Sequence, residues 1–371
     1  MGIEVSNLTK NYGSEVVLED LYLKVPDNSF TSIVAPTGAG KTTLLRIMAG
    51  VEKPTEGKVH YDGEDVTDVS VQKRNISMVY QQFINYPSLT LYENIASPLR
   101  VSEKDLSEEE IDSRVHEVAE LLNIVDLLDH LPEEASGGEK QRTAIARALI
   151  KNPRFTFLDE PLANLDYKLR EELRGQFQVI FKEEQSTFIY ATPAPEDALS
   201  MSTHIGFLHD RDILQFGERE EVYYHPDYVE VGSYLNEPPM NVLSSELIKK
   251  GDKYYFQVSE DLVIEAFDYD KLESGRGYLL GVRPQEVEIG EIDEGVTFET
   301  MVSFNEIVGS TTTLHSDHKD QEIIIFVPEV HRRPEGERLT VSIDPQKLYV
   351  FDEETSELVT QGTKTTLGEK K

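Results

Sequence analysis

The segment that decides the fold reads Ala35-Pro36-Thr37-Gly38-Ala39-Gly40-Lys41-Thr42-Thr43. An apolar run precedes it at residues 30–34, and a run of helical character follows at residues 44–48. A strand that feeds a tight glycine-containing loop and then a helix is the setting of a phosphate-binding loop. Backbone N–H groups of the loop and of the first helical turn converge on one small space, where the helix dipole adds partial positive charge.

The loop matches the pattern G-x-x-x-x-G-K-[ST] at every position except the first, where alanine replaces glycine. We expect residues 36–43 to line a nucleotide, with Lys41 reaching the β- and γ-phosphates and the Thr42 hydroxyl binding Mg²⁺. Because alanine lacks glycine's freedom at positive φ, Ala35 indicates a slightly altered loop.

Composition limits the class of protein. The 371 residues are enough for two or three domains, and the absence of cysteine excludes disulfides, thiolate metal sites and a cysteine nucleophile. The chain opens without a basic and apolar leader, and no window approaches the length of a membrane span, so we expect a soluble, cytosolic protein. A net charge of −33 argues against nucleic-acid partners and against direct docking on anionic lipid. This acidity fits either a saline cytoplasm or an ordinary solvated surface.

Strand-like and helix-like runs alternate over residues 1–234, which predicts an α/β domain with a mostly parallel sheet covered by helices. From residue 235 onward the pattern changes to short strands separated by turns, which predicts an all-β domain of barrel type. The segment Asn236-Glu237-Pro238-Pro239 marks the expected boundary, and residues 363–371 form a polar tail of the second domain.

A second segment with chemistry reads Phe155-Thr156-Phe157-Leu158-Asp159-Glu160-Pro161, an apolar strand that ends in two carboxylates. The carboxyl ends of parallel strands line the ligand crevice, which places Asp159 beside the phosphate loop. We expect Asp159 to hold Mg²⁺ through water and Glu160 to orient and activate the attacking water.

Between these two segments lies Ala135-Ser136-Gly137-Gly138-Glu139, which opens a helix with free N–H groups. At this place in the chain it resembles the Leu-Ser-Gly-Gly-Gln signature of ATP-binding cassette (ABC) ATPases, with Ala135 for leucine and Glu139 for glutamine. The resemblance implies a P-loop ABC domain with a mixed sheet and a helical subdomain at about residues 84–151.

Several site roles are implied by this resemblance. Tyr12 lies where the family stacks an aromatic ring on adenine, and Gln81 matches the glutamine that contacts Mg²⁺ and takes part in catalysis with Lys41 and Glu160. Asp166 matches the D-loop. In this family two subunits face head to tail, so that the signature residues contact the ATP of the other subunit; here these residues are Ser136, Gly137, Gly138 and Glu139.

One family motif is missing. A histidine normally contacts the γ-phosphate after the next strand, and Pro193 occupies that position here. Proline has no side-chain donor and no backbone N–H, so it cannot replace this contact. We therefore expect this chain's own loop mainly to bind ATP, while its signature serves hydrolysis at the site of an unlike partner.

The second domain is similar to the OB-like TOBE domain of the carbohydrate-importer branch, through Gly281-Val282-Arg283-Pro284-Gln285 and a closing segment at residues 344–352. Within that branch the chain most resembles an ATPase subunit of bacterial glycerol importers. The implied partners are a second ABC ATPase subunit, identical or different, the transmembrane permease subunits and, indirectly, a solute-binding protein. The implied location is peripheral, on the cytoplasmic face of the cell membrane, with residues 82–93 forming a groove for a permease helix.

Two other functions stay open at this stage. One is a regulator that binds ATP without hydrolysing it and acts through its β-domain. The other is an ABC ATPase of DNA repair or translation, which the acidic charge and the β-domain disfavour.

Overall fold

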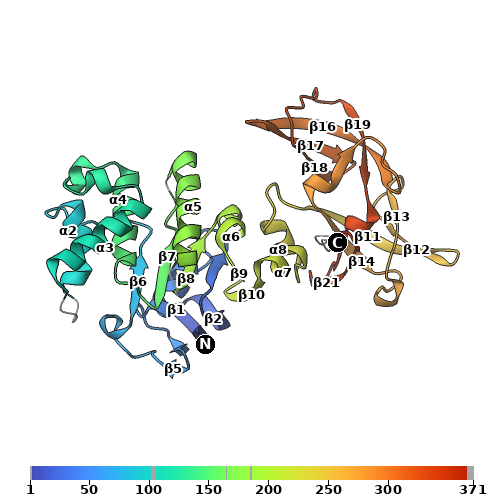
Figure 1. Cartoon of the computed structure of the whole chain (residues 1–371). Helices are drawn as coiled ribbons and strands as arrows, with labels where there is room; N and C mark the ends of the chain where they lie inside the picture. Colours follow the sequence, from blue (N-terminus) through green and yellow to red (C-terminus); the bar gives the residue numbers. More distant parts are fainter. Residues whose placement is uncertain (1, 102–105, 164, 184–185, 366–371) are drawn as a thin grey trace. The chain divides into compact units, whose positions relative to one another are not determined.

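The computed structural model describes residues 2–101, 106–163, 165–183 and 186–365. Packing divides the chain between Arg219 and Glu220 into two compact units (Figure 1). The first unit mixes strands with helices, whereas the second consists mainly of strands. The predicted fold class, an α/β domain followed by an all-β domain, is confirmed.

A six-stranded sheet forms the centre of the first unit, in the order β10-β9-β3-β8-β7-β6. Its strands are β3 (Phe30–Val34), β6 (Ile76–Val79), β7 (Phe155–Asp159), β8 (Thr187–Thr192), β9 (His204–His209) and β10 (Asp212–Glu218). All neighbouring strands pair in parallel except β10 with β9. The carboxyl ends of β3, β6, β7 and β8 therefore lie along one edge of the sheet, where ligands bind in such folds.

A four-stranded antiparallel sheet, in the order β2-β1-β4-β5, completes the strands of the first unit. These strands are β1 (Gly2–Tyr12), β2 (Glu15–Pro26), β4 (Glu56–Tyr61) and β5 (Glu64–Asp65). Val5 of β1 and Leu23 of β2 share one buried core with Leu45 of α1 (Lys41–Ala49) and Phe157 of the central sheet. The helix that begins at the phosphate loop is thus held by both sheets.

The larger helices of the first unit are α2 (Leu91–Arg100), α3 (Glu108–Leu121), α4 (Gly137–Leu149) and α5 (Tyr167–Glu183), followed by the short α6 (Pro195–Met201). Residues of α2, α3 and α4 share a core with Leu158 of β7 and Tyr190 of β8. Helix α2 starts inside residues 82–93, and its Leu91 is fully buried rather than part of a groove. In the described part of the chain, none of the helices combines the length and the apolarity needed to cross a bilayer.

Two sheets make up most of the second unit, in the orders β13-β12-β11-β14-β20-β21 and β15-β19-β16-β17-β18. The first contains β11 (Asn241–Lys250), β12 (Lys253–Gln257), β13 (Val263–Glu265), β14 (Gly277–Val282), β20 (Tyr349–Asp352) and β21 (Leu358–Gln361). The second contains β15 (Val287–Ile289), β16 (Val296–Val308), β17 (Thr311–His318), β18 (Gln321–Val327) and β19 (Arg338–Ile343). Both sheets contribute to one apolar core.

Two short helices, α7 (Arg219–Tyr224) and α8 (Val229–Tyr234), precede the expected boundary at residues 234/235. Apart from Arg219, they belong to the second unit by packing. The guanidinium of Arg283 lies 3.8 Å from the ring centroid of Tyr223, and the N–H of Val229 donates to the carbonyl of Ser356. The segment at residues 236–239, which the sequence marked as the expected boundary, lies inside the second unit.

Candidate active site

The phosphate loop joins β3 to α1 as predicted. Gly38 and Gly40 have φ values of +88° and +106°, a left-handed conformation that residues with a Cβ rarely adopt. Ala35 is fully buried and is not among the residues with positive φ. The expectation that Ala35 alters the loop was therefore wrong in its reason, because the two positions that need glycine still have it.

Lys41 is buried at the start of α1, with 3% of its surface exposed. Its Nζ donates to the carbonyls of Ala35 at 2.9 Å and Pro36 at 3.0 Å, and lies 3.5 Å from Oε1 of Glu160. Burial lowers the pKa of Lys41, and the charges of Glu160 and Asp159 oppose this effect. The loop thus holds a desolvated ammonium group at the site expected for the phosphates.

Thr42 and Asp159 are also brought together, since the Thr42 hydroxyl donates to Oδ1 of Asp159 at 2.8 Å. Asp159 is 1% exposed, and burial raises the pKa of its carboxyl group. Its Oδ2 atom is buried without a hydrogen-bond partner among the described residues. An orphaned carboxylate oxygen beside a hydroxyl fits a divalent cation, and the hard oxygen ligands suit Mg²⁺ with phosphate and water completing the shell.

Glu160 follows directly in the left-handed conformation, with a φ of +46°. Its N–H donates to the carbonyl of Ala191 at 2.9 Å, and its Oε2 accepts a hydrogen bond from Nε2 of Gln81 at 2.9 Å. The ends of β6, β7 and β8 therefore meet at Glu160, β8 through the backbone N–H of Glu160 and Gln81, which follows β6, through the Glu160 carboxylate. The structure joins Gln81, Lys41 and Glu160, the three residues expected to take part in catalysis.

Tyr12 lies at the end of β1 with 46% of its surface exposed. Its hydroxyl donates to Oε1 of Glu52 at 2.5 Å, and the same oxygen lies 2.9 Å from Nζ of Lys10. That ammonium group is also 4.8 Å from the centroid of the Tyr12 ring. Glu52 and Lys10, which the sequence did not single out, orient the aromatic ring expected to meet adenine.

The signature segment forms the first turn of α4. Within the described residues it makes no hydrogen bond or ion pair with the phosphate loop. The N–H of Ser136 donates to Oε2 of Glu139 at 2.7 Å, and the N–H of Glu139 donates back to the Ser136 hydroxyl. The backbone hydrogen bond from Ser136 lowers the pKa of Glu139. Glu139 is therefore an ionised capping residue at a place where the family has a neutral glutamine.

The signature segment lies against the start of α5. Gly138 leaves no room for a Cβ, which would lie 2.3 Å from Cδ2 of Leu169, whereas Gly137 faces open space. Asp166 caps α5, because its Oδ1 accepts a hydrogen bond from the N–H of Leu169 at 3.0 Å. Packing therefore links the segment expected to contact a partner's ATP with the D-loop of the same chain.

The segment after β8 carries Pro193 and is anchored by Asp197, which sequence reasoning missed. Asp197 is 3% exposed and accepts hydrogen bonds from Tyr190 at 2.9 Å and Thr192 at 3.2 Å. Arg174 of α5 donates to the same carboxylate at 2.7 Å. The Thr192 hydroxyl therefore points to Asp197. The sequence shows only two adjacent acidic residues, Glu196 and Asp197, in the first turn of α6, and it does not distinguish the buried one from the other.

A surface groove of about 510 Å³ lies beside residues 82–93. Its lining includes Tyr86, Leu89, Pro98, Val101 and Arg147. The Arg147 guanidinium lies 5.0 Å from the Tyr86 ring centroid and donates to the carbonyl of Ile84. Tyr86 and Leu89 thus line the groove as expected, while Leu91 belongs to the core.

Comparison with known proteins identifies both units. Residues 18–163 match the ABC transporter family and residues 280–351 match the TOBE domain family. The xylose/arabinose import ATP-binding proteins XacJ and XacK of Haloferax volcanii are 35% and 33% identical to this chain, over 96% of it and over 95% and 94% of their own lengths. The sn-glycerol-3-phosphate import ATP-binding protein UgpC of Salmonella typhimurium is 32% identical, over 96% of this chain and 99% of its own.

A solved structure is similar to the first unit. It is the dimeric post-hydrolysis state of an ATP-binding cassette bound to ADP and Pi, with a TM-score of 0.54 and 30% sequence identity. The match covers 58% of this chain and 98% of that one.

Proposed function

The chain belongs to the ABC transporter family, among the ATP-binding subunits of carbohydrate-type importers, and from this membership we propose that it powers the import of a sugar or a glycerol-like polyol. ATP with Mg²⁺ is the substrate of this family, and its hydrolysis is coupled to transport. The observation that carries the proposal is the cluster of Lys41, Thr42, Asp159 and Glu160 at one sheet edge.

Each member of the cluster has a distinct proposed task. Thr42 and Asp159 would hold Mg²⁺, which would neutralise charge on the bound phosphates. Lys41 turns from the loop carbonyls and Glu160 toward the β- and γ-phosphates. Glu160, oriented by Gln81, is the residue of this site that would accept a proton from water as the water oxygen bonds to the γ-phosphorus and the bond to the ADP oxygen breaks. In the pair of unlike subunits proposed below, this site contributes only a small part of the total turnover.

The second proposed element is a dimer of unlike ATPase subunits. Pro193 offers no donor at the switch position, and the Thr192 hydroxyl is engaged by Asp197. XacJ and XacK carry the same transport name and come from the same organism, and the solved cassette is dimeric. We infer that a different subunit completes the pair, with Ser136, Gly137 and Gly138 serving the partner's ATP.

The third proposed element is attachment to the cytoplasmic face of the membrane through permease subunits. The groove bordered by Tyr86, Leu89 and Val101 is partly apolar and suits the apolar face of a short permease helix. A solute-binding protein would act on the other side of those permeases. In this proposal the permease and solute-binding subunits determine which solute is transported, so we propose the chemical class of the solute only.

The experiment compares two variants of the assembled transporter. We expect Glu160→Gln in this chain to retain most of the ATP turnover, while the equivalent change in the partner abolishes it. Near-complete loss from Glu160→Gln alone would contradict the unlike pair. Loss from neither change would favour the regulator that binds ATP without hydrolysis.

A further inference from the structure

We propose that Arg74 is a positioning residue for the nucleotide base, acting through Gly50 and Glu52 on Tyr12. The inference rests on the proposed function, because it takes Tyr12 as the residue that stacks on adenine. Arg74 lies between η1 (Val71–Lys73) and β6, far along the sequence from both Tyr12 and the phosphate loop. It was not among the residues expected to act in the site.

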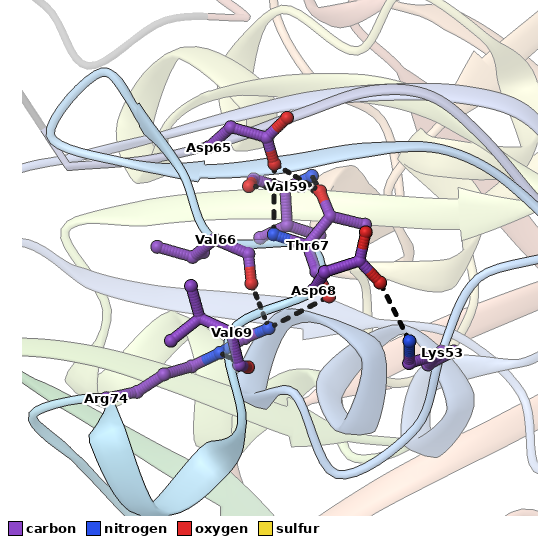
Figure 2. Close-up of polar contacts among 8 residues, drawn as sticks. All are labelled: Lys53, Val59, Asp65, Val66, Thr67, Asp68, Val69 and Arg74. Atoms are coloured by element: carbon purple, nitrogen blue, oxygen red, sulfur yellow. Dashed lines mark hydrogen bonds and ion pairs between the residues drawn. The ribbon is translucent and has the colours of Figure 1, made fainter.

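Arg74 is 7% exposed, and its guanidinium is surrounded by backbone carbonyls (Figure 2). Nε donates to Val69 at 3.0 Å, while Nη2 donates to Val66 and, at 3.4 Å, to Thr67. Nη1 donates to the carbonyl of Met48 at 3.0 Å. The guanidinium also lies 5.5 Å from the ring centroid of Tyr61. Arg74 forms no ion pair with the residues that the structure describes, so neutral oxygens and this ring compensate its buried charge.

The carbonyl of Met48 belongs to the last turn of α1, whose first turn carries Lys41 and Thr42. The carboxyl end of a helix has partial negative charge, which favours a buried cation at this place. Arg74 therefore anchors one end of the helix whose other end meets the phosphates. Removing it disturbs the end that lies away from the phosphates.

Gly50 ends α1 in the left-handed conformation, with a φ of +76°, and the guanidinium packs directly on it. A Cβ on Gly50 would lie 2.3 Å from Cζ of Arg74. The turn that follows is therefore clamped between the helix end and the guanidinium. The same turn is linked to the segment of residues 66–74 by an ion pair of Lys53 with Asp68 at 2.7 Å, which Figure 2 also shows.

Glu52 lies in this turn, and its N–H donates to the carbonyl of Arg46 at 3.2 Å. Its carboxylate holds both the hydroxyl of Tyr12 and the ammonium of Lys10. Arg74 packs on Gly50, the backbone of residues 50–52 leads from there to Glu52, and Glu52 holds Tyr12. Loosening the turn frees the Tyr12 ring and leaves Lys41 and Thr42 in place. We therefore infer that the affinity contributed by the base is lost while the affinity for the phosphates is kept.

The experiment measures two dissociation constants for the full chain in the presence of Mg²⁺. One ligand is ATP, and the other is inorganic tripolyphosphate, which has the phosphates without the base. The variants are Arg74→Met, Arg74→Lys and Tyr12→Ala, with Glu52→Ala as a second route if Arg74→Met fails to fold. The matched control is Arg154→Met, which removes another partly buried arginine, held by Asp27 at 2.6 Å and Asp62 at 3.3 Å, outside this chain of contacts.

We expect Arg74→Met to weaken ATP binding about tenfold, the scale of one lost base-stacking contact, and tripolyphosphate binding less than twofold. The ATP affinity of Arg74→Lys should lie between those of the parent and Arg74→Met, because lysine keeps the charge but not the five donors of arginine. Arg154→Met should lower the Tm and leave the ratio of the two constants unchanged. The double variant Tyr12→Ala with Arg74→Met should be no more base-selective than Tyr12→Ala alone.

The proposal is overturned if Arg74→Met weakens the binding of ATP and of tripolyphosphate equally. It is likewise overturned if Arg74→Met lowers only the Tm, as Arg154→Met does. It is also overturned if Tyr12→Ala leaves the ratio unchanged, because Tyr12 then does not contact the base. In that case the assignment of the phosphate loop is untouched, since it is tested separately through Lys41.

Discussion

The ammonium of Lys41 lies 3.5 Å from the carboxylate of Glu160, so the side chain expected to bind phosphate is paired with the side chain expected to activate water. Both groups are nearly buried, with side-chain exposures of 3% and 10%. A γ-phosphate that enters the loop has to separate them. Each partner compensates the charge of the other, so nucleotide binding exchanges this ion pair for contacts of Lys41 with phosphate.

Replacement of Lys41 by alanine should abolish most of the ATP affinity. Charge-assisted hydrogen bonds contribute about 1.5–3 kcal/mol each, so we expect the dissociation constant for ATP to rise about a hundredfold. Titration of the full chain with Mg²⁺-ATP measures this. Lys58→Ala is the control, because Lys58 forms an exposed ion pair with Asp65 and should leave affinity unchanged. Equal affinities of the two variants would show that Lys41 does not meet the phosphates.

Asp159→Asn should stabilise the nucleotide-free chain. Burial raises the pKa of Asp159, so ionising it at neutral pH costs folding free energy that an uncharged amide avoids. We expect the Tm at pH 7 to rise by roughly 2–4 °C, the scale of 1 kcal/mol in a domain of this size. Nucleotide should then stabilise the variant to the same extent with and without Mg²⁺.

The sign of the pH dependence follows from linkage. When the pKa of a carboxyl is higher in the folded than in the unfolded state, the free energy of unfolding of the protein falls as the pH rises from the unfolded pKa through the folded pKa. The Tm difference between Asp159→Asn and the parent should therefore be largest above the folded pKa and shrink as the pH falls. A difference that is constant from pH 7 down to pH 4 would contradict this account.

The two signature glycines should respond differently to alanine. Gly138→Ala places a Cβ 2.3 Å from the end of the Leu169 side chain, which must rotate away from its packed position. Gly137→Ala meets nothing and should gain a little helix propensity. We expect Gly138→Ala to be less stable than Gly137→Ala by about 1 kcal/mol in chemical denaturation. In the Leu169→Ala background the steric strain is relieved, so Gly138→Ala and Gly137→Ala should have similar stabilities. A difference as large as that in the parent would contradict the contact between Gly138 and Leu169.

Much of the site was predictable because its chemistry is local in sequence. The loop, Thr42 and the pair Asp159 and Glu160 each follow a buried strand, and parallel strands bring their ends to one edge. The start of α2 was also readable, since Thr90 and Glu93 form a capping box. This helix start was not predicted, because the aromatic residues within residues 82–93 suggested an exposed groove.

The remaining features depend on contacts between distant segments. The burial of Asp197 is explained by its hydrogen bonds with Arg174, Tyr190 and Thr192, and no periodicity in the sequence predicts this arrangement. The role inferred for Arg74 likewise depends on Gly50, whose missing Cβ matters only once the two segments are packed. Ala35 shows the converse, because the motif mismatch falls at a position whose φ is not positive and which therefore does not require glycine for its backbone conformation.

The acidic surface sets the response to salt. The chain has 69 acidic and 36 basic side chains, so most of the surplus carboxylates cannot form ion pairs. Repulsion among them opposes the compact state, and it weakens as the screening length falls from about 10 Å at 0.1 M salt to about 3 Å at 1 M. Helix α3 adds a local example, because its last turn has no basic residue to balance the helix dipole.

We therefore expect the Tm of the full chain to rise by several degrees between 0.1 M and 1 M KCl. The variant Glu117→Gln with Glu120→Gln removes two exposed carboxylates near the carboxyl end of α3, where negative charge opposes the dipole. It should be more stable than the parent at 0.1 M KCl, and the two should converge at 1 M. Sucrose at matched osmolality is the control for preferential exclusion of solute. A Tm that is independent of KCl, or an advantage of the variant that persists at 1 M, would contradict electrostatic repulsion as the cause.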